Sequence, residues 1–263
     1  MIYGDFHVHT TFCDGKNTAE ELVQTALQKG LSFLGFSGHS HTVIDESYCV
    51  RDTVAYKKEI ARLKEAYAGQ MDIYCGIEQV YQTQEGTEDY DYAIGSVHYF
   101  LKDGILRDVD HTAALLEKTV EELFHGDWYA MAEHYYADVA DLPNRHKIDI
   151  VGHFDLITKF NAENRFFDEE HPRYLAAAFD ALDSLLKRDL PFEVNTGVMF
   201  RGYRQMPYPA MPLLKRIKEK GGYVLLSGDV HRAQGLCYGF ETWYPGLRDM
   251  GLNILSFPEI VRK

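Results

Sequence analysis

Two hydrophobic patterns alternate along the chain. Short apolar runs, which are typical of buried strands, are followed by longer segments in which apolar residues recur every three or four positions, as in amphipathic helices. Strands are expected at residues 2–8, 31–36, 71–77, 92–97, 148–152, 191–194, 223–226 and 253–257. This repeated order of strand and helix predicts parallel strands that are connected by crossover helices.

Capping signals place several of the helices. Thr18 and Glu21 have the spacing of a capping box, and the helix that they open should end at Gly30. Helical periodicity with similar boundary residues predicts further helices at residues 52–67, 171–187 and 212–221. Seven or eight strand and helix units without a flexible linker favour one α/β domain, residues 1–263, folded as a TIM-like barrel. An open doubly wound sheet is the alternative.

The composition narrows the class of protein. With 46% hydrophobic and 25% charged residues the chain is typical of a globular protein, and its net charge of −13 without a basic run argues against a nucleic-acid partner. No apolar run is long enough for a membrane span and the first residues do not form a signal peptide, which predicts a cytoplasmic protein. The four cysteines lack metal-binding spacing, so we expect reduced thiols.

Histidines and carboxylates stand after most of the expected strands, at their carboxyl ends. In a parallel barrel these ends meet on one face, so residues that are far apart in sequence become neighbours. Side chains at i and i+2 point the same way, so His7 and His9, and likewise Asp229 and His231, can contact one centre. The candidate metal ligands are His7, His9, Asp14, His39, Glu78, His98, His153, Asp229 and His231.

The residue types indicate which metals would suit this site. Imidazole and carboxylate groups without thiolate favour a catalytic centre for zinc, manganese or iron over a structural zinc site. Each histidine alone would more often be a core or loop residue, but the shared position of the set favours metal binding. Asp14 precedes Gly15, so a turn is the alternative role for this aspartate. Six other histidines are expected in loops or helices: His41, His111, His125, His134, His146 and His171.

Five segments together resemble the polymerase and histidinol phosphatase (PHP) family. They are Asp5-Phe-His-Val-His-Thr, Gly76-Ile-Glu78, Gly95-Ser-Val-His98, Gly152-His-Phe-Asp155 and Ser227-Gly-Asp-Val-His231. Other segments are similar to its histidinol-phosphate phosphatase branch, among them Glu193-Val-Asn-Thr-Gly with Arg201. The resemblance covers nearly the whole chain and implies a distorted barrel of seven strand and helix units.

The resemblance also implies a centre of two or three divalent ions. The first ion would be held by His7, His9, Glu78 and Asp229. The second would share Glu78 and be held also by His98 and His153. The third would be held by Asp14, His39 and His231. One departure concerns the residue before His39, where the family usually has an acidic side chain and this chain has Gly38.

The implied activity is hydrolysis of a small phosphomonoester, L-histidinol phosphate, in histidine biosynthesis. Its expected catalytic residues are Glu78, Asp229 and His231, and the general acid is either His231 or a water molecule on a metal. Cations on the loops after the fifth and sixth strands are candidates for binding the phosphate, with ordinary surface charge as the alternative. These cations are Lys159, Arg201 and Arg204.

Three readings of the function remain open at this point. A broad-specificity PHP phosphoesterase, or a nuclease or nucleotidase, would use the same ligands, although the acidic charge argues against nucleic acid. A silent module that binds metal or a partner would not need so complete a ligand set. The organic part of the substrate has only weak candidates, Asp155, Tyr99 and Tyr203, for which structural roles are the alternative.

Overall fold

The computed structural model describes residues 4–42 and 44–261. Eight parallel strands form the main sheet, in the order β1-β2-β3-β4-β7-β8-β9-β10, and β5 and β6 form a separate antiparallel pair. The main strands are β1 (Gly4–Asp5), β2 (Phe33–Phe36), β3 (Asp72–Val80), β4 (Tyr92–Ser96), β7 (Ile150–Val151), β8 (Phe192–Asn195), β9 (Tyr223–Ser227) and β10 (Asn253–Ile254). The pair consists of β5 (Tyr99–Lys102) and β6 (Ile105–Asp108).

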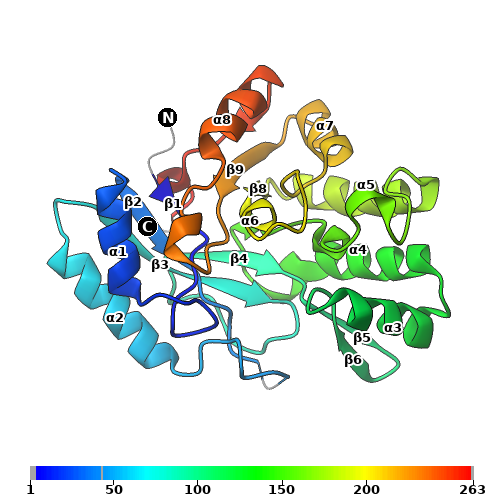
Figure 1. Ribbon diagram of the computed structural model, residues 1–263, viewed down its shortest axis with the longest axis horizontal. Helices are drawn as coiled ribbons and strands as arrows, with labels where there is room; N and C mark the ends of the chain where they lie inside the picture. Colours follow the sequence, from blue (N-terminus) through cyan, green and yellow to red (C-terminus); the bar gives the residue numbers. More distant parts are fainter. Residues whose placement is uncertain (1–3, 43, 262–263) are drawn as a thin grey trace.

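Helices lie around the outside of the strands (Figure 1). They are α1 (Ala19–Gln28), α2 (Thr53–Ala66), α3 (Ala113–Phe124), α4 (Trp128–Arg145), α5 (Pro172–Leu186), α6 (Gly197–Phe200), α7 (Met211–Glu219) and α8 (Phe240–Asp249). None of the helices in the described part of the chain combines the length and the apolar character that a membrane crossing requires. The α/β class and the barrel-like arrangement are confirmed.

The barrel has different strand counts at its two ends. After β1 the chain pairs at Val8 with Val230, which follows β9, through His9 N–H to Val230 O and Val230 N–H to His7 O, each at 2.8 Å. At the opposite end β10 pairs instead with the first residues of β9, Tyr223 and Val224. Seven strands therefore surround the carboxyl end, as the resemblance implied, and β10 is added only at the amino end.

The capping signals predicted the helix boundaries correctly. Thr18 accepts a hydrogen bond from the Glu21 backbone N–H while the Glu21 carboxylate accepts one from Thr18 N–H, so both halves of the capping box are present. α2 begins after the cap Asp52, and α5 and α7 occupy the predicted segments. Gly30 has a φ of 72°, the left-handed conformation in which helices commonly end.

Two predicted strands are wrong in part. The first, residues 2–8, is a strand only at Gly4–Asp5, with Val8 in an isolated bridge, and its residues 2 and 3 lie outside the described part of the chain. The last, residues 253–257, ends at Ile254 because Ser256 and Glu259 form a capping box that opens a short 3-10 turn at Phe257. In both cases the apolar run continues beyond the strand, because an isolated bridge or a capping box determines the backbone conformation there.

Two polar loops follow β2 and β7. Residues 40–51 follow β2 and contain no regular element among those described, and residues 161–170 hold only a short 3-10 turn. The β5–β6 hairpin was not predicted. Its pairing of Tyr99 with Asp108 follows directly on the strand end that carries His98.

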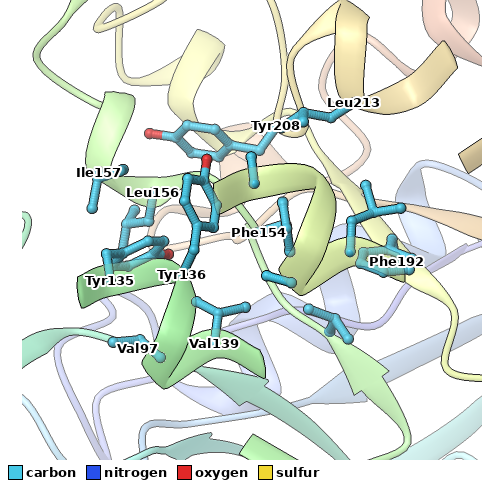
Figure 2. Packing of buried hydrophobic residues seen from close by; sticks show 14 of the residues in the cluster. Val97, Tyr135, Tyr136, Val139, Phe154, Leu156, Ile157, Phe192, Tyr208 and Leu213 are labelled. Carbon is cyan, nitrogen blue, oxygen red and sulfur yellow. The ribbon is translucent and has the colours of Figure 1, made fainter. Parts of the chain in front are cut away.

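The largest core cluster lies between the sheet and the helices α3, α4, α5 and α7. In Figure 2 the rings of Tyr136, Phe154 and Phe192 form a continuous packed row, with centroid separations of 5.2 Å and 5.5 Å. Tyr136 comes from α4 and Phe192 from β8, while Phe154 follows the candidate ligand His153. This packing fixes the strand ends that carry the site.

A smaller core cluster depends on one residue near the end of the chain. Phe257 is 3% exposed and stacks on Phe6 with centroids 4.8 Å apart. Its ring also packs against those of Phe33, Tyr74 and Tyr92, with centroid separations of 5.4 Å, 5.4 Å and 4.7 Å. The turn at Phe257 thereby joins β10 to the amino half of the barrel.

Phe257→Ala should lower the free energy of unfolding by about 3–5 kcal/mol, because it removes a buried ring and leaves a cavity. Urea denaturation would measure the change. The matched control is Tyr223→Ala, which removes a 44% exposed ring at the start of β9 and should cost less than about 0.5 kcal/mol. Equal losses in the two variants would contradict the role of Phe257 in the core.

Candidate metal centre

Glu78 lies at the centre of the site. It occupies β3, is 1% exposed, and its backbone is fixed by hydrogen bonds from Glu78 N–H to Gly38 O and from Ser40 N–H to Glu78 O. Five imidazole rings direct a nitrogen at its carboxylate, at distances of 2.8 to 3.5 Å. They belong to His7, His9, His39, His98 and His153.

The alternation predicted after β1 is confirmed. The rings of His7 and His9 lie 5.2 Å apart on the side of the site, while Val8 between them is buried in the hydrophobic cluster of α1 and α2. Asp229 approaches both rings, with Oδ1 at 3.8 Å from His7 Nε2 and 3.3 Å from His9 Nε2. Asp229 has a φ of 44°, so its backbone turns sharply after β9.

A second group surrounds Asp14. One carboxylate oxygen lies 3.6 Å from His9 Nδ1 and 3.7 Å from His39 Nε2, and the other lies 3.1 Å from His231 Nε2. The Asp14 side chain therefore points toward the histidines, and this orientation is compatible with a turn at Asp14 and Gly15. All nine candidate ligands meet at one end of the barrel, as the positions after the strands predicted.

Three groups of these side chains have donor atoms close enough to share an ion. They are His7, His9 and Asp229; His39, Glu78 and His98; and His9, Asp14, His39 and His231. These groups differ in one detail from the assignment that the resemblance to the family implied. In the structure His39 groups with Glu78 and His98, whereas His153 contacts Glu78 through Nε2 at 2.8 Å.

The donor atoms fit a cation. Within the described residues five ligand atoms at the cluster are buried and lack a hydrogen-bond partner: His7 Nε2, His9 Nε2, Asp14 Oδ1, His39 Nδ1 and Glu78 Oε2. Buried lone pairs that face one another without a proton between them are unfavourable, because each loses its water and gains no partner. Divalent cations held by the three groups would compensate these atoms.

The charges of the cluster keep its acidic groups ionised. Burial would raise the pKa of Glu78, but the charges of His39, His7 and His98 hold this pKa well below its usual range. Burial, followed by the charges of His231 and His39, lowers the pKa of His9 to about 3. At neutral pH the pair is therefore a carboxylate and a neutral imidazole, the forms that bind metals.

Gly38 leaves no space for the acidic side chain that the family usually has before its second-motif histidine. A Cβ atom at Gly38 would lie 2.7 Å from Val50 Cγ2 and 3.2 Å from Cys13 Sγ. The Cys13 sulfur lies 3.6 Å from His9 Nδ1, so a thiol occupies this region of the site. Burial raises the pKa of Cys13 to about 12, and the thiol stays protonated.

A cavity of about 370 Å³ opens beside the cluster. Candidate ligands line it together with Lys159 and Arg201. Its lining also includes a second set of residues, which we call the acidic wall: Tyr48, Tyr99, Tyr203, Asp45, Asp108 and Asp110, with His111 beside them. The cavity therefore offers both positive and negative charge, and Asp110 lies within 3.4 Å of the candidate ligand His98.

The three cationic side chains predicted to bind phosphate differ in their positions relative to the cavity. Arg201 donates from Nη2 to Asp229 Oδ2 at 2.8 Å and from Nη1 to Asp229 O at 3.0 Å, while its Nε has no partner among the described residues. Lys159 donates to Asp110 Oδ2 at 2.9 Å. Arg204 does not line the cavity: it is held by Glu169 at 2.7 Å and by Thr158 O.

The sequence analysis assigned no role to two carboxylates that touch the ligands. Glu193 in β8 contacts His7 Nδ1, and Asp110 Oδ1 lies 3.4 Å from His98 Nδ1. A buried glutamate inside an apolar strand was the available signal for Glu193. Among the weak candidates, Tyr99 and Tyr203 line the cavity, whereas Asp155 is buried elsewhere and accepts a hydrogen bond from Ala210 N–H.

Comparison with known families agrees with this geometry. The family described as PHP domain matches residues 5–197. The chain belongs to the PHP domain family. Residues 5–197 of this PHP domain protein include seven of the nine candidate ligands, and the last two, Asp229 and His231, follow the matched region.

Curated relatives of this PHP domain protein match nearly its full length. A probable histidinol-phosphatase of Deinococcus radiodurans is 30% identical over 96% of this chain and 95% of its own length. The histidinol-phosphatase of Bacillus subtilis is 27% identical over 91% of this chain and 97% of its own.

A solved structure shares the fold of this PHP domain protein. The histidinol phosphate phosphatase of Lactococcus lactis, in complex with zinc, L-histidinol and phosphate, superposes with a TM-score of 0.73 over the whole of both chains. Its sequence identity to this chain is 21%.

Zinc should stabilise the chelator-treated protein in a concentration-dependent manner, because the candidate ligands would come together to bind an ion only when the chain is folded. At a free zinc concentration 100 times the dissociation constant the gain is about 2.7 kcal/mol. His9→Asn should reduce this gain, since His9 belongs to two of the ligand groups. His125→Asn, an exposed position at the end of α3, is the control and should keep it. Thermal unfolding that is unaffected by zinc would contradict a metal centre.

Proposed function

We propose that this PHP domain protein is a histidinol-phosphatase, which hydrolyses L-histidinol phosphate to L-histidinol and inorganic phosphate. The observation that carries the proposal is the cluster of nine candidate ligands beside a cavity whose lining holds both cations and carboxylates. Relatives with this name match it over nearly their full length. The cytoplasmic location expected from the sequence is part of the same proposal.

The proposed centre holds two or three divalent ions, which are zinc, manganese or iron. His7, His9 and Asp229 would hold one of them. Glu78 would be shared with the ion held by His98 and His153, and Asp14, His39 and His231 would hold the third. Bound there, the ions supply an ionised water at neutral pH and positive charge for the phosphoryl oxygens.

Arg201 and Lys159 are proposed to bind the phosphate. Arg201 is oriented by Asp229, and its unpartnered Nε leaves a donor for a phosphoryl oxygen. Lys159 is held at the cavity by Asp110, which fixes its ammonium group. Arg204 was predicted to share this role, but its pairing with Glu169 supports a contribution to the shape of the loop instead.

His231 is the proposed proton donor to the departing alcohol in a centre with two ions. Burial would lower the pKa of His231, but the nearby charge of Asp14 raises it above its usual value, which favours the protonated ring at neutral pH. Its side chain is 24% exposed and lines the cavity. Glu78 and Asp229 act as ligands that keep the reacting phosphate and water in place.

The acidic wall suits the organic part of the substrate. Histidinol carries an ammonium group and an imidazole, which favour carboxylates and aromatic faces. Tyr99 and Asp108 lie opposite one another in the β5–β6 hairpin, and both line the cavity. We place the ammonium group near Asp108 and the imidazole among the tyrosines Tyr48, Tyr99 and Tyr203.

Phosphate release should be at least about tenfold faster in kcat/KM for L-histidinol phosphate than for phenyl phosphate, because the acidic wall contributes only to the first. Phosphate assays with zinc, manganese and iron supplied separately would measure it. Equal rates would refute the assignment and leave a broad-specificity phosphoesterase. Release of mononucleotides from single-stranded DNA at a comparable rate would favour the nuclease alternative.

Asp108→Asn should raise KM for L-histidinol phosphate about tenfold or more and leave phenyl phosphate hydrolysis unchanged, since a hydrogen bond to a charged group contributes about 1.5–3 kcal/mol. Asp103→Asn, at the exposed tip of the same hairpin, is the matched control. The same loss for both substrates would contradict a contact between Asp108 and the ammonium group.

A further inference from the structure

Strand β8 supplies none of the nine candidate ligands, yet its Glu193 lies directly behind two of them. The residue is 0% exposed. Its Oε1 lies 2.5 Å from His7 Nδ1, the ring nitrogen that points away from the cluster. Its Oε2 accepts a hydrogen bond from the backbone N–H of His153 at 2.8 Å. One carboxylate therefore contacts ligands from both β1 and β7.

All the groups around this carboxylate are donors. Besides His7 and His153, Ser227 Oγ donates to Oε1 at 2.5 Å and Asn195 Nδ2 donates to Oε2 at 3.0 Å. An ionised carboxylate has about four acceptor positions, and here four donors occupy them. Asn195 Oδ1 is in turn engaged by Gly197 N–H, which fixes the orientation of its amide.

This arrangement determines which nitrogen of His7 carries the proton. An ionised acceptor at Nδ1 requires the Nδ1–H form, which leaves the lone pair on Nε2. Nε2 faces the cluster, 3.2 Å from Glu78 Oε2 and 3.8 Å from Asp229 Oδ1, and has no hydrogen-bond partner within the described residues. The contact with Glu193 thus presents a free lone pair where an ion would bind.

We propose that Glu193 is a positioning residue of the metal centre, which fixes the tautomer of His7 and couples His7 to His153. Three other candidate histidines have weaker outer contacts. His98 Nδ1 is 3.4 Å from Asp110, His9 Nδ1 is 3.6 Å from Cys13 Sγ, and His153 Nδ1 has no hydrogen-bond partner in the described part of the chain. His7 is the ligand whose orientation depends on a fully buried carboxylate.

Glutamine cannot reproduce these contacts despite its equal size. If its amide NH₂ replaces Oε1, it donates to His7 Nδ1 and moves the ring proton to Nε2, where the lone pair was available. If the NH₂ replaces Oε2, its hydrogens face two other donors, the His153 N–H and the Asn195 amide. The first orientation removes the lone pair from the face of the ring that meets the cluster, and the second leaves buried donors opposed. The substitution therefore tests charge and acceptor capacity at unchanged side-chain volume.

The test uses zinc alone and so stays separate from the substrate assignment, although it rests on the proposed metal centre. Zinc affinity of Glu193→Gln would be measured by competition with a chromogenic chelator, and thermal unfolding of the metal-free protein would be followed in parallel. We expect affinity to fall about 10–100-fold, the range typical of lost outer contacts to a metal-binding histidine. Nitrogen NMR of the His7 ring should show loss of the Nδ1–H tautomer.

Two further variants make the result specific. Glu169→Gln changes a carboxylate that pairs with Arg204 away from the cluster, and should keep the wild-type zinc affinity. Glu193→Asp keeps the charge but shortens the reach to His7, and should also bind zinc more weakly. Wild-type zinc affinity in Glu193→Gln would overturn the proposal. Loss of the folded metal-free state in both Glu193 variants would overturn it as well, because the carboxylate would then serve the fold and not His7.

Discussion

A buried carboxylate surrounded by imidazoles is the constraint on which the other features depend. Glu78 is almost inaccessible to water, and a charge in such a place is unfavourable unless neighbouring groups compensate it. The five compensating imidazoles come from four different strand ends, so the strands must keep their register for the site to exist. Closure of the barrel through Val8 and Val230 meets this need, because it fixes the His7 and Asp229 segments against one another.

The sequence predicted which side chains meet at one end of the barrel, because most of their positions follow from local pattern. Apart from Asp14, they stand at or just after the end of an apolar run, and parallel topology brings such positions together. Glu193 could not be assigned a role in this way, since its contact with His7 depends on the relative register of β8 and β1, 186 residues apart. The predicted position of Arg204 at the cavity was wrong for a similar reason. Its partner Glu169 belongs to a loop whose path has no local signal in the sequence.

Arg201 links the ligand cluster to the substrate cavity. Two of its nitrogens hold Asp229, and a third is unpartnered within the described residues. Its charge also holds the pKa of the buried Asp229 well below the usual range, against the effect of burial. The same guanidinium thus keeps a candidate ligand ionised and extends positive charge toward the place proposed for the phosphate. Neither function is independent of the other.

The β5–β6 hairpin forms its own two-stranded sheet, outside the main one. It supplies Tyr99 and Asp108 to the cavity wall but none of the nine clustered ligands. Because it is not part of the eight-stranded sheet, changes in it are not expected to alter the register of those strands. The proposed selectivity could therefore change through one short peripheral hairpin while the ligand cluster is preserved, and an engineer could exchange this segment between relatives for the same reason.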